Sequence, residues 1–241
     1  MIVPGNTPDI IRGATGGTTC GPTRGTARGV PRGAGFLIFV LLGQFISGLD
    51  IDPILAGEFW VELSPFVQTE DEYPLSEEEA HRRILEEAQY VFSGIIYGFT
   101  FVYTPSDRTR EVDEIFDIAI TAQIPWGDPA LSIVEVRSEN NLLHALVRYT
   151  PIEHQLRWLR MMGSNVYPGS TGVGTGSLFL GVEQKTAAMS DGVKEAIRAY
   201  LRSRILNKPK EIRGKAVFTE VPYVIINEGT YSARVSVKID I

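Results

Sequence analysis

The final segment of the chain, TYSARVSVKIDI at residues 230–241, constrains the fold more than any other. Polar residues alternate there with apolar or aromatic ones, which are Tyr231, Ala233, Val235, Val237, Ile239 and Ile241. Successive side chains of a strand point to opposite faces of a sheet. The segment is therefore predicted to be a strand with one face in the core and the other in water, as is usual in antiparallel sheets.

Other segments supply partners for this strand. They alternate in the same way or are rich in β-branched and aromatic residues, and they cover 59–64, 95–107, 115–120, 131–137, 142–149, 177–183, 212–219 and 223–226. In the second of them, Gly98 is expected at a bend and Pro105 at the end of the strand. Short turns separate most of these segments, which favours antiparallel pairing.

Three further segments have the apolar spacing of amphipathic helices: 76–94, 150–163 and 187–207. Ser76 with Glu79, and Thr150 with Glu153, have capping-box spacing, in which side-chain oxygens accept N–H groups of the first turn. In the first helix the residues expected on the solvent face are Arg82, Arg83, Glu86 and Glu87. Glycine is expected to end the first two helices, and Pro209 prevents the third from continuing.

Together these segments predict an α+β fold, with an antiparallel sheet of about six to eight strands and two or three packed amphipathic helices. Residues 50–241 have the length of a single domain. An outer-membrane barrel would share the alternation, but long amphipathic helices between strands disfavour it. Cys20 is the only cysteine and precedes this domain, so the core must be stable without a disulfide.

An uncharged segment, FLIFVLLGQFISGL at residues 36–49, precedes the domain and follows three arginines. It is too short for the ~20 apolar residues of a membrane-spanning helix. Basic, apolar and then small residues form the order of an export signal, with cleavage expected after Gly48. Residues 1–35 are rich in glycine and threonine and are predicted to be disordered. The alternatives are an uncleaved anchor through 36–49, which would associate the protein with a membrane, and a buried core helix.

Net charge limits the partners of the exported portion. The whole chain has 23 basic and 29 acidic side chains; removing residues 1–49, with four arginines and one aspartate, leaves 19 basic and 28 acidic, a net charge of −9. Nucleic-acid affinity comes largely from Lys and Arg on phosphates. The balance therefore disfavours a general nucleic-acid binder, and the expected location is periplasmic or secreted.

The histidines do not form a recognisable metal or catalytic motif. His81, His144 and His154 lack the spacing of three or four residues that places two ligands on one helical face. A site from His144, Glu153 and His154 is an alternative, because a strand and a helix adjoin there. Ordinary structural roles are favoured, so no catalytic residue, cofactor or metal ligand is predicted.

A glycine-rich segment at residues 168–176, PGSTGVGTG, is predicted to be a surface loop or a wide hairpin tip. Gly172, Gly174 and Gly176 could surround a phosphate with backbone N–H groups, but phosphate loops lead from a strand into a helix. Here the segment leads into the apolar SLFLGVE. Ser170 lacks the G-x-S-x-G context of a hydrolase nucleophile because position 168 is proline.

Three segments carry a resemblance to known proteins: GIIYGFTFVYTPSD at 94–107, TPIEHQLRWLRMM at 150–162, and the final helix with its strands. Over residues 75–241 the chain resembles exported proteins of unknown function from spirochaetes. The resemblance implies a periplasmic setting. It transfers no activity and no site residue.

Two classes of function follow. The first is a non-enzymatic binding or structural protein of the cell envelope, with a protein partner contacted by exposed aromatic residues such as Trp126, Trp158 and Tyr167. Of these, Trp158 fits the helix core better, because it shares a helix face with His154 and neighbours Leu159. The second is a periplasmic hydrolase or small-ligand carrier whose site leaves no linear motif. An apolar surface patch would favour the first class, and a deep pocket with two buried titratable groups would favour the second.

Overall fold

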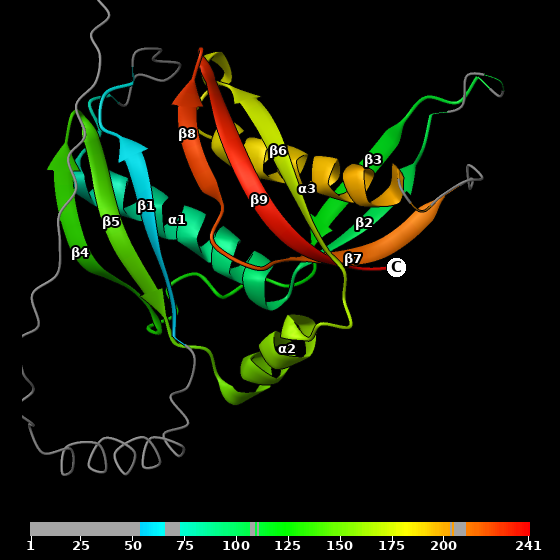
Figure 1. Ribbon diagram of the computed structural model, residues 1–241. Coiled ribbons are helices and arrows are strands. Elements are labelled where there is room, and N and C mark those ends of the chain that lie inside the picture. The colour runs from blue at the N-terminus through cyan, green and yellow to red at the C-terminus, as the bar shows by residue number, and fades with distance from the viewer. Residues whose placement is uncertain (1–53, 66–72, 107–108, 110, 203, 205–210) are drawn as a thin grey trace, which may run out of the picture. The chain divides into compact units, whose positions relative to one another are not determined.

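The computed structural model describes residues 54–65, 73–106, 109, 111–202, 204 and 211–241, all within the compact unit Ile51–Ile241. The predicted leader at 1–35 and the signal-like segment at 36–49 lie outside the described residues. The described part has strands and helices in an α+β arrangement, which confirms the predicted fold class (Figure 1). In this part, no helix is both long enough and apolar enough to cross a membrane.

The elements follow the predicted order with several changes of boundary. In chain order they are β1 (Leu55–Glu62), α1 (Glu77–Ile96), β2 (Phe99–Thr104), β3 (Ile115–Ile120), β4 (Leu131–Glu139), β5 (Leu142–Tyr149), α2 (Glu153–Gly163), β6 (Gly169–Ser177), the 3-10 helix η2 (Leu178–Leu180), α3 (Gln184–Arg202), β7 (Ile212–Phe218), β8 (Tyr223–Asn227) and β9 (Thr230–Asp240).

The strands form two antiparallel sheets. The smaller sheet has the order β1-β5-β4, and the larger has the order β3-β2-β7-β9-β6. β8 pairs with β9 on the same edge as β7, further along the strand. The alternation predicted for 230–241 is confirmed, because the side chains from Tyr231 to Ile239 at every second position are buried. Ile241, beyond the strand, is exposed.

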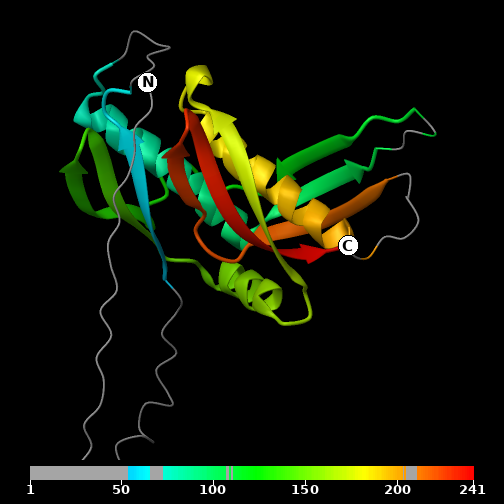
Figure 2. The ribbon, with the colours of Figure 1, turned by 45° about the horizontal axis from the view of Figure 1, so that its top comes forward.

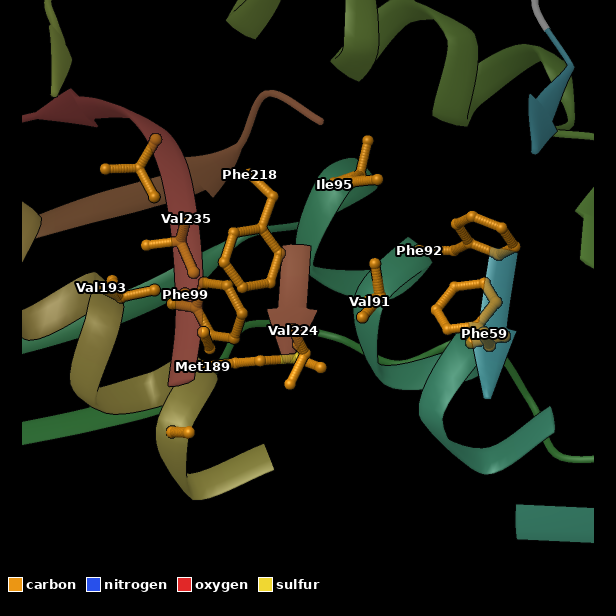
Figure 3. Packing of buried hydrophobic residues seen from close by; sticks show 14 of the residues in the cluster. Phe59, Val91, Phe92, Ile95, Phe99, Met189, Val193, Phe218, Val224 and Val235 are labelled. Atoms are coloured by element: carbon orange, nitrogen blue, oxygen red, sulfur yellow. The ribbon is translucent and has the colours of Figure 1, made fainter. Parts of the chain in front are cut away.

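Helix α1 contributes to the packing of both sheets. It contacts β1, β4 and β5 of the smaller sheet and β7 of the larger one. Phe92 meets Phe59 of β1 edge to face, with ring centroids 5.6 Å apart, and Phe99 meets Phe218 in the same way at 4.9 Å (Figure 3). These rings belong to one cluster of buried apolar residues that joins the two sheets through the helix.

The start of α1 is as predicted, but its end is not. Ser76 Oγ accepts a hydrogen bond from the Glu79 N–H at 3.2 Å, which confirms the cap. The helix continues through Gly94 to Ile96, so the strand predicted from residue 95 begins only at Phe99. Gly94 serves packing here, since an added Cβ would lie 2.7 Å from the Phe218 ring. Gly98, with φ +69°, makes the turn between helix and strand.

The predicted cap of α2 is also corrected. The helix begins at Glu153, after Thr150 and Pro151, and its N-cap is Ile152. The Ile152 N–H donates to Gln155 Oε1 at 2.8 Å. Gln155 is buried, and its amide also donates to the Tyr149 hydroxyl at 2.9 Å. A side chain from inside the first turn therefore replaces the expected threonine.

The glycine-rich segment is a strand, not the predicted loop. β6 pairs with β9 along its whole length, and α3 packs on it. A Cβ on Gly172 would lie 2.2 Å from Gly192 O, and one on Gly174 would lie 2.1 Å from Gly192 N. The helix backbone thus rests directly on the strand. Glycine is required here for close approach, which is why the strand lacks the usual β-forming residues.

The segment after β6 differs from its prediction as well. SLFLGVE was expected to be a strand, but it contains the short helix η2, in which Phe179 and Leu180 are exposed. Ser177 caps η2 by accepting a hydrogen bond from the Phe179 N–H. Helix α3 begins at Gln184, three residues before its predicted start. Its predicted end near residue 207 falls outside the described residues.

Because β6 and α3 are in close contact, we expect that one methyl group added to β6 will strongly destabilise the fold. Gly174→Ala would place a Cβ 2.1 Å from Gly192 N and 2.2 Å from Ala188 O, so strand and helix must separate. We expect a loss of about 3 kcal/mol in the free energy of unfolding, measured by urea denaturation. Gly169→Ala on the same strand is the control, because its nearest neighbour is 3.9 Å away. Equal stability of the two variants would contradict this account.

Candidate functional site

The two sheets meet along a groove between β1 and β8. Among the described strands, β1 is at an edge of the smaller sheet, and β8 pairs only with β9 in the larger one. The space between them, here called the β1–β8 groove, has a volume of about 410 Å³. Its lining includes Glu58, Trp60, Leu142, His144, Val224 and Ile226. This volume lies in the range of small-molecule sites, roughly 300–1,000 Å³.

Trp60 crosses from one sheet to the other. It follows the buried Phe59 on β1, so alternation places it on the opposite face of the strand. Its indole Nε1 donates to the carbonyl oxygen of Val224 on β8 at 3.3 Å. Its ring also lies 6.3 Å from that of Tyr231 on β9. Trp60 therefore satisfies a free carbonyl of the β8 edge and forms one wall of the groove.

Lys185, at the start of α3, completes this junction. Its Nζ donates to the carbonyl oxygen of Trp60 at 2.6 Å and to the Glu87 carboxylate at 2.6 Å. It also lies 3.9 Å from the centroid of the Trp60 ring, in a cation–π contact. One ammonium group thus links β1, α1 and α3. The ammonium group satisfies a backbone carbonyl on the edge of β1, just as the Trp60 indole satisfies one on the edge of β8.

The Lys185–Glu87 ion pair is buried, with 9% and 13% of the two side chains exposed. Burial lowers the pKa of Lys185 and raises the pKa of Glu87, because each charged form loses hydration. The attraction between the two charges opposes both shifts. The groups consequently depend on each other, since either charge alone would be buried without compensation.

A second, smaller hollow is also lined by Trp60. Its volume is about 170 Å³, and Glu62, Arg83, Glu86, Glu183 and Tyr231 are among its lining residues, together with the buried pair. Tyr231 donates its hydroxyl hydrogen to Glu62 Oε2 at 3.0 Å. Burial raises the pKa of Tyr231 above its ordinary value, so the phenol stays a neutral donor.

A charged cluster borders the groove on the smaller sheet. His144 Nδ1 lies 3.0 Å from Glu58 Oε1, and Arg137 donates to the same oxygen at 2.5 Å. Arg137 of β4 lies directly opposite His144 of β5, and Glu58 of β1 is two residues from Trp60, the direct partner of His144. The cluster orients polar groups at the rim, while the wall formed by Leu142, Val224 and Ile226 is apolar.

The other histidines do not join this cluster. His154 is exposed on α2. His81 on α1 is half-buried, and its buried Nε2 has no hydrogen-bond partner among the described residues. His144 pairs with Glu58, so the alternative site of His144, Glu153 and His154 is not formed. In the described portion no three His, Cys, Asp or Glu side chains are grouped as a metal site.

The remaining sequence candidates have other roles. Ser170 Oγ donates to the carbonyl oxygen of Ala196 at 2.7 Å, so it fastens β6 to α3. Trp126 is exposed, as predicted, and Tyr167 is half-buried. Trp158 is 38% exposed and lies below Lys215 in a cation–π contact, so its assignment to the helix core was wrong.

The sequence contained one usable signal for the buried pair. Glu87 was expected on the solvent face of its helix, yet it lies three residues after Ile84 and four before Val91, both buried. That spacing places it on the apolar face. Lys185 and Trp60 left no comparable signal, because 125 positions separate them and no motif joins them.

Comparison with known proteins shows similarity over most of the chain. A protein-family model matches residues 47–241, which are 195 of the 241 residues. An uncharacterised protein of Treponema pallidum (strain Nichols) is 25% identical over 150 residues. That alignment covers 62% of this chain and 63% of the relative. No solved structure matches the chain.

The structural role of the buried Lys185–Glu87 pair can be tested with single and double variants. Lys185→Met leaves the Glu87 carboxylate buried without its partner, and we expect a loss of about 3–5 kcal/mol in the free energy of unfolding. The double variant Lys185→Met/Glu87→Leu removes both charges and should recover most of that loss. Urea denaturation of the single and double variants measures the difference. A double variant as unstable as the sum of both single variants would contradict mutual compensation.

Proposed function

Because the chain belongs to a spirochaetal family of uncharacterised proteins, we propose its function from its own geometry: it is an exported, non-enzymatic binding protein whose ligand lies in the β1–β8 groove. The observation that carries this proposal is a groove of about 410 Å³ with an apolar wall, lined also by Glu87 of the buried ion pair. Small-molecule sites combine these properties, with mostly apolar linings and a few fixed polar groups.

The pairing of the charged groups favours binding over hydrolysis. A catalytic lysine or carboxylate must be available to the reacting atoms, in a protonation state suited to its role. Lys185 instead donates to Glu87 and to the Trp60 carbonyl, and Glu58 accepts from Arg137 and approaches His144. These contacts support a rigid binding site with its polar groups fixed in place.

The lining also indicates the class of ligand. Leu142, Val224 and Ile226 offer apolar contact, and the Trp60 indole ring offers a flat surface. The carboxylate at the rim, Glu58, is already neutralised by Arg137. A neutral, largely apolar molecule therefore fits better than an anion or a strong cation. A carrier of such a molecule through an aqueous envelope compartment would shield it from water.

Export is the other part of this proposal. It is supported by the order of basic, apolar and small residues from Arg24 to Gly48. A protein partner in the envelope fits the same setting, with the exposed Trp126 as one contact. Anchoring through residues 36–49 is the alternative if cleavage does not occur.

Groove binding can be tested with N-phenyl-1-naphthylamine, a neutral apolar dye whose fluorescence rises out of water. We expect saturable binding to the protein and a weakening of at least about tenfold, or 1.4 kcal/mol, in Ile226→Arg, because the new charge enters the apolar wall. The control is Val173→Arg, an exposed apolar position on β6 outside the groove lining. Equal affinity in both variants, or no binding by the parent protein, would refute the proposed site.

Export can be tested by sequencing the N-terminus of the protein purified from its native cells. We expect a mature chain that begins near Leu49, because the peptidase requires small residues such as Ser47 and Gly48. Fractionation of the same cells should place this chain outside the cytosol. An isolated chain that retains Phe36 would contradict cleavage, and its recovery from the membrane fraction would support the anchor instead.

A further inference from the structure

Strand β3 forms one outer edge of the larger sheet. It pairs with β2 on one side, and the described residues place no strand on the other side (Figure 2). We propose that a second copy of this chain pairs with β3 there, antiparallel, about a two-fold axis through Ile118. The result is a dimer with a sheet that continues across the two subunits.

The first step is to identify which backbone groups of β3 are free. The Thr121 N–H, directly after the strand, donates to Gly98 O at 2.9 Å. Backbone groups of alternate residues in an antiparallel pair point to the same side. Residues 115, 117 and 119 therefore direct their N–H and C=O groups toward β2. The groups that point away from the sheet belong to Phe116, Ile118 and Ile120.

The other edges that the structure describes are obstructed or occupied. Lys185 donates to a carbonyl of β1, and Trp60 donates to a carbonyl of β8. On β6, the Thr175 N–H donates to the Asp191 carboxylate at 3.1 Å. Natural sheets prevent edge-to-edge pairing in ways like these.

A bulge and charged side chains protect β4 from pairing with another strand at its edge. Its register shifts between Ile133 and Glu135, which marks a bulge, and charged side chains at Glu135, Arg137 and Glu139 follow. Bulges and charges are common protections of edge strands. β3, with the sequence IFDIAI, has no lysine, arginine or proline, and Asp117 is its only charged residue. Its regular pairing with β2 shows no shift.

The pattern of β3 is complementary to itself. With the axis at Ile118, Phe116 lies opposite Ile120 of the second copy, and the two Ile118 residues face each other. These are the residues with free backbone groups, so each pair can exchange two N–H···O bonds. Asp117 lies opposite Ala119, which keeps the two carboxylates from being direct partners.

The side chains gain burial in the same register. Phe116, Ile118 and Ile120 are half-buried in one subunit, and Phe116 stacks on Phe101 with centroids 6.2 Å apart. When β3 pairs with β3 of the second copy, the apolar faces of the two strands form one continuous surface across the axis, and these side chains become more buried. A foreign strand could use the same hydrogen bonds, but it would need its own matching pattern, which a second copy already has.

Sedimentation of the full chain tests the association. We expect a concentration-dependent dimer for the parent protein and a monomer for Ile118→Lys, because the new charge lies on the apolar face at the axis. Val173→Lys, an exposed position on β6 at the other end of the sheet, should stay dimeric. Circular dichroism checks that both variants are folded. A monomeric parent protein, or a dimeric Ile118→Lys, would overturn the proposal.

Cysteine cross-linking tests the register without weakening the interface. In a Cys20→Ser background, Ile118→Cys should form a covalent dimer on mild oxidation, because the paired Cα atoms would lie about 5.5 Å apart. Ala119→Cys is the control, since its copy would be a diagonal neighbour about 7–8 Å away. Cross-linking of the control as fast as Ile118→Cys, or of neither variant, would refute the two-fold register.

Discussion

The contact between Lys185 and Glu87 is the interaction on which the arrangement of the two sheets depends. Removing two charges from water is costly, and only their attraction and their additional hydrogen bonds offset that cost. The lysine therefore stays close to the carboxylate, and the carbonyl of Trp60 is held to the same ammonium. This fixes β1 relative to α1 and α3, and with it the indole that reaches β8. The groove exists because a tryptophan, not a continued backbone ladder, connects the two edges.

Patterns that depend on neighbouring residues were predictable from the sequence. The alternation in 230–241 identified β9 and its buried face, and Ser76 identified the start of α1. Both depend on interactions within a few residues, which sequence spacing records. The division of the strands into two sheets was not predictable in this way, because it depends on which strand edges meet in the folded chain.

The errors share a physical cause. Glycine at Gly94 and along β6 was interpreted through its backbone freedom, as a terminator or a loop, but the structure uses its lack of a side chain for close packing. The cap of α2 was assigned to Thr150, while a buried glutamine with tertiary contacts took that role. Tertiary packing decided each case, and a single sequence does not contain the partner surface. The same reason concealed the junction of Trp60 and Lys185.

Helix α1 has a consequence for how the protein opens. Its residues pack on both sheets, and Phe59 and Phe218 belong to one continuous core with it. Neither sheet can detach without exposing apolar surface of that helix, so the two should lose their amide protection together. Slow exchange of backbone hydrogens would then report one cooperative unit spanning both sheets, with fraying confined to strand ends.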